Sequence, residues 1–262
     1  MPVNILFIGD IVGKPGRQAV SRELHRLVDR YSIDLVIANG ENASGGFGIT
    51  AESAKELFNC GVDLFTSGNH IWDKKEALEY LKKEDRIIRP SNYPEGAPGK
   101  GSTVFVTPGG IKVGVVNLEG RVFMDALDCP FRAADREVTA LSEITKVIFV
   151  DFHAEATSEK TSMGWYLDGR VSAVVGTHTH VQTADERILT AGTAYITDAG
   201  MTGAFDSVIG VRKDEPIYRF LTQMPAKFEV AKKDLRVNGV VVTIDEVSGN
   251  ALAIERVNIP CG

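Results

Sequence analysis

Cysteine and positive charge are both scarce in this sequence of 262 residues, and each shortage excludes a class of protein. The three cysteines (Cys60, Cys129 and Cys261) are odd in number, lie far apart and form no C-x-x-C pair, which indicates a reducing compartment and no disulfide framework. The formal net charge of -6 argues against a protein that binds long nucleic acid through its phosphates, because that mode of binding needs a basic surface. A small anionic substrate remains compatible with this charge, because a bound metal ion can dominate the local field.

Long apolar segments are missing as well. No segment approaches the length of a membrane span, and the apolar run in "MPVNILFIGD" is too short for a signal peptide and meets Asp10 at once. We therefore expect a cytoplasmic protein with no membrane partner. No repeat, low-complexity tract or linker divides the chain, so we expect a single domain over residues 1–262.

Short, continuous apolar runs rich in β-branched residues predict strands that are buried on both faces. These runs are "NILFIGD" (4–10), "DLVIANGEN" (34–42), "VDLFTSGNH" (62–70), "KVGVVNLEG" (112–120), "KVIFVDFHAE" (146–155), "VSAVVGTHTH" (171–180) and "TAYITDAG" (193–200). Helical spacing of apolar residues predicts helices over 17–31, over 51–61 with Thr50 as N-cap, and over 73–83 with Asp73 as N-cap. This alternation predicts a mainly parallel sheet with helices outside it.

Three further segments depart from this alternation. Residues 237–259 contain two strand-like runs joined by a Ser-Gly-Asn turn, which predicts an antiparallel hairpin and therefore a mixed or double sheet system. Residues 89–101 and 120–132 are long and irregular, and loops of that length in a compact domain are often functional.

Metal-capable side chains follow five of the predicted strands. They are Asp10, Glu41 and Asn42, Asn69 and His70, His153, and finally His178 with His180. Sites in open α/β sheets form beyond the carboxyl ends of strands, so we expect these side chains to converge in one crevice. Residues i and i+2 of a strand point to the same side, so His178 and His180 could serve one metal or substrate group. The fifth histidine, His25, lies within a helical pattern and is expected to be a solvated helix residue.

The number and kind of these donors indicate a particular type of metal site. Two carboxylates, two carboxamides and three imidazoles are too many for one tetrahedral zinc ion, but they suit two adjacent ions that share a carboxylate. A mixed nitrogen and oxygen site without thiolate favours manganese, iron or zinc over Cu(I).

The order of these motifs resembles that of the calcineurin-like metallophosphoesterases. The matching elements are "GD" (9–10), "GEN" (40–42), "GNH" (68–70), "DFHAE" (151–155) and "GTHTH" (176–180). Three features depart from the usual pattern: the histidine of D-x-H is missing after Asp10, Glu41 replaces the bridging Asp, and Thr177 is inserted before His178. These three departures, together with the segments "NGENASGGFGIT" (39–50) and "YITDAGMTG" (195–203), resemble the YmdB-like bacterial branch of this family. That resemblance covers nearly the whole chain.

The resemblance implies a fold, an activity and a set of metal ligands. The fold would be α/β, a β-sandwich of two mixed sheets flanked by helices in α-β-β-α layers. The activity would be that of a 2',3'-cyclic nucleotide phosphodiesterase with two metal ions, iron first, manganese or zinc otherwise. One ion would be held by Asp10, Glu41, Asn42 and His180, and the other by Glu41, Asn69, His153 and His178, with Glu41 as the bridge.

His70 is expected to be catalytic. In an extended segment its side chain would point away from that of Asn69 and therefore toward the substrate. There it would protonate the leaving oxygen or stabilise charge on the phosphoryl group, while a hydroxide that bridges the two metals attacks. The alternative, that His70 only orients Asn69, stays open.

Several other residues have more than one interpretation. The glycine-rich stretch 43–48 either lets backbone approach a bound phosphate or is merely a tight turn. Phe123, Met124 and Phe131 could form a lid or base-stacking face, an oligomer contact or a satellite core. Asp198, Asp185 and Glu155 either orient metal-bound imidazoles or serve as caps and ion pairs.

Two other functions compete with a small-nucleotide phosphodiesterase. One is a metal-binding regulatory protein that acts through a partner with little turnover, and it is favoured by the altered first metal site. The other is a nuclease on RNA, which the acidic balance disfavours. The sequence is compatible with a homo-oligomer.

Overall fold

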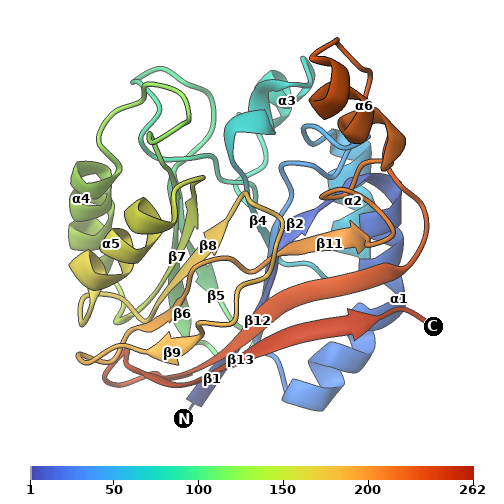
Figure 1. Cartoon of the computed structure of the whole chain (residues 1–262). Helices are drawn as coiled ribbons and strands as arrows, with labels where there is room; N and C mark the ends of the chain where they lie inside the picture. Colours follow the sequence, from blue (N-terminus) through green and yellow to red (C-terminus); the bar gives the residue numbers. More distant parts are fainter. Residues whose placement is uncertain (1) are drawn as a thin grey trace.

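Two β-sheets face each other in the computed structural model, which describes residues 2–262, and helices cover the outer side of each sheet (Figure 1). The first sheet has the order β2-β11-β12-β1-β3-β4, with β13 also paired to β12, and the second has the order β5-β6-β7-β8-β10-β9. The strands are β1 (Pro2–Ile8), β2 (Asp10–Ile11), β3 (Leu35–Asn39), β4 (Leu64–Thr66), β5 (Ser102–Val106), β6 (Lys112–Glu119), β7 (Val147–His153), β8 (Ala173–Thr177), β9 (Arg187–Ile188), β10 (Ala194–Ile196), β11 (Met201–Ala204), β12 (Leu235–Asp245) and β13 (Ala251–Pro260). The helices are α1 (Gly13–Tyr31), α2 (Ala51–Asn59), the 3₁₀ helix η1 (Asn69–Trp72), α3 (Ala77–Tyr80), α4 (Pro130–Ser142), α5 (Thr157–Leu167) and α6 (Asp214–Thr222).

Both sheets combine parallel and antiparallel pairs. In the first, β1 is parallel to β3 and β3 to β4, while β12 is antiparallel to β1, β11 and β13. In the second, β6, β7, β8 and β10 are parallel and the outer strands β5 and β9 are antiparallel to their neighbours. The predicted sandwich of two mixed sheets with outer helices is therefore confirmed, as is the antiparallel hairpin of β12 and β13.

The core explains why the strand sequences are apolar without alternation. One apolar layer lies between the sheets, where the rings of Phe7 and Phe149 stack with centroids 5.3 Å apart. A second layer lies between the first sheet and α1 and α2, and a third between the second sheet and α4 and α5. The central strands are thus buried on both faces, which requires apolar side chains at successive positions.

The N-terminus of α2 agrees with the prediction from the sequence. Thr50 Oγ1 accepts a hydrogen bond from the Ser53 backbone N–H at 3.2 Å, and Ser53 Oγ accepts one from the Thr50 N–H at 3.0 Å. This reciprocal capping satisfies two of the N–H groups that the first turn leaves without a helical partner.

The predicted helix over 73–83 is wrong in its extent. Helix α3 spans only Ala77–Tyr80, and Asp73 does not cap it. Within 73–83 only Ala77 and Leu81 are buried. So little apolar surface cannot anchor a longer helix, because short helices depend on tertiary packing.

Two further outcomes concern residues outside the sheets. The stretch 120–132 was predicted to be irregular throughout, but α4 begins at Pro130, where the ring suits the first turn of a helix. His25 is exposed on α1, as expected. Within the described residues 2–262, no helix has both the length and the apolarity needed to cross a membrane.

Candidate metal centre

The predicted site residues come from both sheets and meet at one edge of the sandwich. Asp10 follows β1, and Glu41 with Asn42 follows β3. Asn69 and His70 lie in η1 just after β4, His153 ends β7, and His178 and His180 follow β8. Because the parallel strands of both sheets end on this side, the structure brings all of these residues together.

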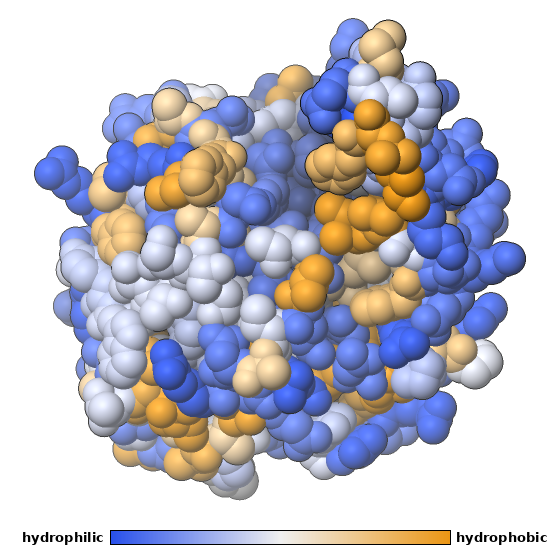
Figure 2. All heavy atoms as spheres, in the orientation of Figure 1, coloured by the Kyte–Doolittle hydropathy of each residue, from blue (hydrophilic) through white to orange (hydrophobic). Residues whose placement is uncertain are grey.

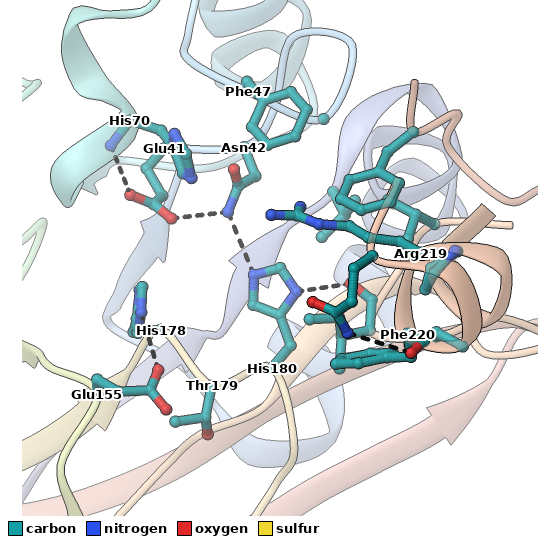
Figure 3. Close-up of a pocket in the computed structure, with 18 residues that line it drawn as sticks. Glu41, Asn42, Phe47, His70, Glu155, His178, Thr179, His180, Arg219 and Phe220 are labelled. Carbon is teal, nitrogen blue, oxygen red and sulfur yellow. Dashed lines mark hydrogen bonds and ion pairs between the residues drawn. The ribbon is translucent and has the colours of Figure 1, made fainter. Parts of the chain in front are cut away.

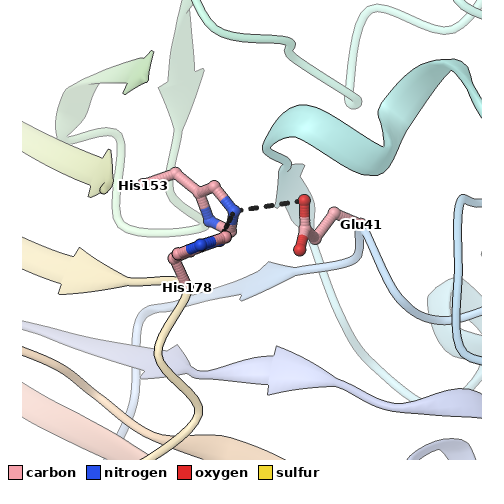
Figure 4. Close-up of side chains that lie close together, drawn as sticks. All are labelled: Glu41, His153 and His178. Carbon is pink, nitrogen blue, oxygen red and sulfur yellow. Dashed lines mark hydrogen bonds and ion pairs between the residues drawn. The ribbon is translucent and has the colours of Figure 1, made fainter. Parts of the chain in front are cut away.

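His153 is at the centre of one group of ligand-capable atoms. Its Nε2 lies 3.2 Å from Glu41 Oε2, 3.1 Å from Asn69 Oδ1 and 3.0 Å from His178 Nδ1. Figure 4 shows the His153 and His178 rings close together beside the Glu41 carboxylate. Glu41, His153 and His178 offer ligand atoms that all lie within 4.8 Å of one another, which suits a single bound cation.

A second group shares Glu41 with the first. Asp10, Glu41 and His180 also offer ligand atoms that lie within 4.8 Å of one another. Asn42 lies between two members of this group, because its Nδ2 is 2.7 Å from Glu41 Oε1 and 3.2 Å from His180 Nε2 (Figure 3). Glu41 thus presents one carboxylate oxygen to each side.

The buried carboxylate of Asp10 fits a cation. Its Oδ2 accepts a hydrogen bond from the His178 N–H at 3.1 Å, but its Oδ1 has no hydrogen-bond partner among the described residues. Burial raises the pKa of Asp10, since an ionised carboxylate without full solvation is costly. A bound metal ion would compensate that desolvation, so the donor chemistry of this group suits a metal.

The ionisable groups of the first ligand group shift the pKa values of one another. Burial opposes charge on both Glu41 and His153, but their mutual attraction prevails: it lowers the pKa of Glu41 to about 2 and raises the pKa of His153 to about 9. Burial and the neighbouring charge of His153 lower the pKa of His178 to about 3. His178 is therefore neutral at pH 7, the form in which imidazole coordinates metals.

Gly68 permits these side chains to approach each other. A Cβ atom at this position would collide with the His153 ring and with Glu41 Oε2. Only glycine leaves room there, which gives the glycine of "GNH" a steric role.

The interpretation of His178 and His180 as neighbours on one strand is wrong. Strand β8 ends at Thr177, and both histidines have left-handed backbone conformations, with φ of 98° and 67°. Such conformations cost about 1–3 kcal/mol each for residues other than glycine. As a result the two imidazoles belong to different groups, one with His153 and the other with Asp10.

A buried ion pair holds the strained turn that carries these histidines. Asp198 Oδ2 accepts hydrogen bonds from Thr179 N at 3.1 Å and Thr179 Oγ1 at 2.7 Å, and Lys160 Nζ lies 2.6 Å from the same oxygen. Lys160 and Asp198 are almost fully buried. Asp198 therefore acts on the backbone between the two histidines and not on an imidazole.

A second buried network orients His153. Its Nδ1 lies 2.9 Å from Thr177 Oγ1, which donates to Asp151 Oδ1 at 2.7 Å, and Asn39 Nδ2 donates to Asp151 Oδ2 at 3.0 Å. With Nδ1 fixed, Nε2 faces Glu41 and Asn69. No supporting role was predicted for Thr177, Asp151 or Asn39, although the polar residues inside "DLVIANG" and "VIFVDF" were a visible signal.

His70 faces the same cavity, but for a different reason from the one expected. It lies in the 3₁₀ helix η1 and not in an extended segment. Its backbone N–H donates to Glu41 Oε2 at 3.1 Å, its Nδ1 lies 2.9 Å from Asp73 Oδ2, and its ring meets that of Phe47 edge-on with centroids 4.9 Å apart. These contacts fix the ring and leave Nε2 without a hydrogen-bond partner among residues 2–262.

The groups open into a cavity of about 630 Å³. Figure 3 shows Glu41, Asn42, His70, His178 and His180 around it, with Phe47 on one side and Arg219 and Phe220 of α6 on the other. The glycine-rich stretch 43–48 contributes Phe47 and makes a tight turn in which Gly45, Gly46 and Gly48 have positive φ.

Other residues singled out in the sequence have varied surroundings. Glu155 Oε2 lies 3.1 Å from His178 Nε2, so it does contact an imidazole, whereas Asp185 accepts hydrogen bonds from Thr197. Met124 and Phe131 pack against the apolar layer under α4 and α5, which is the satellite-core interpretation. Phe123 is 89% exposed, and none of these three lines the cavity.

Two facing mixed sheets with metal-capable side chains where their parallel strands end define a metallophosphoesterase-type α/β fold. The family model described as YmdB-like protein matches residues 6–257, and the chain belongs to this family. It is 49% identical over 257 residues to the 2',3'-cyclic-nucleotide 2'-phosphodiesterase of Bacillus subtilis (strain 168), an alignment that covers 98% of this chain and 97% of the relative.

Solved structures agree with this assignment. A hypothetical protein from Thermus thermophilus superposes with a TM-score of 0.93 at 45% identity, covering 99% of this chain and 100% of that chain. A novel phosphatase from Mycoplasma pneumoniae superposes with a TM-score of 0.93 at 34% identity, covering 99% of this chain and 94% of that one. The chain is thus a homologue of a cyclic-nucleotide phosphodiesterase and carries a buried cluster that could hold a metal.

Proposed function

We propose that this chain is a metal-dependent phosphodiesterase that hydrolyses small cyclic nucleotides such as 2',3'-cyclic AMP. The observation that carries the proposal is the pair of ligand groups that share Glu41 and open into one cavity. The 49% identity to the Bacillus subtilis enzyme supports the same class of reaction. The 2'-ester is the bond we expect to be cleaved, as in the name of that relative.

Two metal ions are proposed, and Glu41 would bridge them. One would be held by Asp10, Glu41, Asn42 and His180, and the other by Glu41, Asn69, His153 and His178. Nitrogen and oxygen donors without thiolate suit iron, manganese or zinc, and iron is the first candidate from the family resemblance. Asn42 would bind through its carboxamide oxygen, which requires its amide to rotate from the present contact of Nδ2 with Glu41.

When bound, the cations would supply positive charge to the phosphate and a nucleophile at neutral pH. The chain itself supplies the proton for the leaving oxygen. Asp73 accepts a hydrogen bond from His70 Nδ1, and Phe47 packs on the same ring, so Nε2 is the nitrogen held toward the cavity. His70 is therefore proposed to act as the imidazolium, with a proton on each ring nitrogen: it donates the Nε2 proton to the ribose 2'-oxygen as the bond of that oxygen to phosphorus breaks, and it keeps the Nδ1 proton that Asp73 accepts.

The size and charge of the molecule favour a small substrate over long RNA. The cavity of about 630 Å³ lies within the range of roughly 300–1,000 Å³ usual for small-molecule sites. The net charge of -6 provides no general attraction for a polyanion.

The test is hydrolysis of 2',3'-cyclic AMP by the purified chain loaded with manganese or iron, followed by chromatography of the products. We expect adenosine 3'-phosphate, and we expect turnover to disappear after chelation and in Asp10→Asn. Asp29→Asn, an exposed change on α1, is the matched control and should remain active. Hydrolysis that survives both chelation and Asp10→Asn contradicts the proposal.

A further inference from the structure

The cavity above the metal centre has two unlike walls. One wall is polar and consists of the ligand-capable residues around Glu41. The wall formed around α6 is largely apolar and includes Ile209, Val211, Pro216, Phe220 and Phe228, while Phe47 lies on the other side, where its ring contacts His70. A phosphate group needs only the polar wall, so the apolar wall suits a different part of the ligand, one that is flat and uncharged.

The aromatic side chains of the apolar wall, and Phe47 across the cavity from them, are available to a ligand. Phe220 is 78% exposed and Phe47 is 37% exposed, while Phe228 is half-buried. Figure 2 shows hydrophobic side chains gathered over α6 beside a hydrophilic hollow. Aromatic rings that stay this exposed next to a polar site are suited to stacking on a nucleobase, because every base offers an apolar π-face.

Arg219 adds a planar cation to the same wall. Figure 3 shows its side chain reaching from α6 toward the side on which Asn42 and His180 lie. Its guanidinium carbon lies 5.6 Å from the centroid of the Phe228 ring, and no ion pair of Arg219 is found among residues 2–262. A planar guanidinium beside an aromatic ring can stack on a base and donate hydrogen bonds to its edge.

We infer that Phe47, Arg219, Phe220 and Phe228 form a subsite for the nucleobase of the substrate. This inference rests on the proposed phosphodiesterase function and names the part of the nucleotide that the metal ligands do not contact. The phosphate lies against the ligand groups, and the base lies between the glycine-rich turn and α6. Substrate preference therefore depends on α6, which belongs to none of the metal-ligand motifs.

The experiment compares two substrates that share the cyclic ester and differ in the base. One is 2',3'-cyclic AMP, and the other is methyl β-ribofuranoside 2,3-cyclic phosphate, which has no base. Phe220→Ala removes one stacking surface, and Phe220→Tyr keeps it. Leu221→Ala is the matched control, because Leu221 is 80% exposed on the same helix and does not line the cavity.

Phe220→Ala is expected to raise KM for 2',3'-cyclic AMP about 5- to 100-fold, the range for losing one stacked base, with kcat changed less than about twofold. The preference for 2',3'-cyclic AMP over the base-free ester should fall by the same factor. Phe220→Tyr should restore the preference, and Leu221→Ala should leave it intact. An equal loss of kcat/KM on both substrates overturns the inference. A Phe220→Ala variant with an unchanged substrate preference but a changed oligomeric state also overturns it, because that result marks α6 as an interface between copies of the chain.

A second measurement separates this inference from the proposed function. If the metal-loaded protein hydrolyses neither substrate, the proposed function fails and the subsite is tested by saturation-transfer NMR with adenosine 3'-phosphate. Transfer to the adenine protons that is lost in Phe220→Ala supports the subsite. No transfer to the adenine protons of the unmodified protein overturns it.

Discussion

Replacing Lys160 by methionine removes one partner of the buried ion pair behind the histidine turn. Lys160 Nζ and Asp198 Oδ2 lie 2.6 Å apart, and both side chains are at most 1% exposed. The variant leaves a buried carboxylate that still accepts hydrogen bonds from Thr179 N, Thr179 Oγ1 and Gly200 N. Those three bonds exist before and after the change, so they do not offset the lost cation.

The magnitude follows from two limits. Breaking a buried ion pair by removing one partner costs about 3–5 kcal/mol. A buried aspartate that loses its cationic partner can instead be protonated. Protonation of an ordinary aspartate at pH 7 costs about 4 kcal/mol, and this cost is the upper bound on the loss in free energy of unfolding. We therefore expect Lys160→Met to lower the free energy of unfolding by about 3–4 kcal/mol at pH 7, equivalent to a fall in Tm of roughly 6–16 °C.

The assay is urea unfolding of metal-free protein followed by circular dichroism. Lys232→Met is the matched control, because Lys232 is exposed, and its effect should stay within about 0.5 kcal/mol. The double variant Lys160→Met/Asp198→Asn removes both charges and should lose at least about 1 kcal/mol less than the sum of the single variants. A loss below about 1 kcal/mol for Lys160→Met, or strict additivity in the double variant, would refute the reasoning.

Three more variants test the supports of the site. Thr177→Val removes the hydroxyl that fixes His153 Nδ1, so metal binding should weaken about 10- to 100-fold in a competition titration with a chelator, while unfolding stays cooperative. An unchanged metal affinity would show that Thr177 does not support His153. Gly68→Ala places a methyl group against the His153 ring and Glu41, so the purified variant should contain less metal by mass spectrometry than the unmodified protein; equal metal content would contradict the steric argument. His70→Ala should lower kcat about 10²- to 10⁴-fold with bound metal retained, and loss of metal instead would show that His70 acts on the ligands.

The central strands of the sheets could be predicted because they are buried on both faces, which leaves continuous apolar runs in the sequence. Helix α5 could not be predicted, since it buries the charged residues Glu159 and Lys160 and exposes Trp165 and Tyr166. The partner that makes this burial tolerable, Asp198, lies 38 residues along the chain from Lys160, so no local pattern reveals it.

In the site, too, the features set by local sequence could be predicted, and the features set by contacts between distant residues could not. The ligand-capable residues were visible because each follows the carboxyl end of an apolar run. The left-handed turn at His178 and His180 was not visible, since the contacts of Thr179 with Asp198 hold it. Phe220 was missed because the metal-ligand motifs end at residue 180, and only the fold brings α6 over the cavity.

The most direct test of the central claim is the rate of 2',3'-cyclic AMP hydrolysis measured against the number of manganese ions bound per chain. Because the two ligand groups share Glu41, we expect turnover to stay low up to one ion per chain and to reach its full value at two. We expect no turnover in Glu41→Gln at any manganese loading. Full turnover at one ion per chain, or none with two ions bound, would contradict the account.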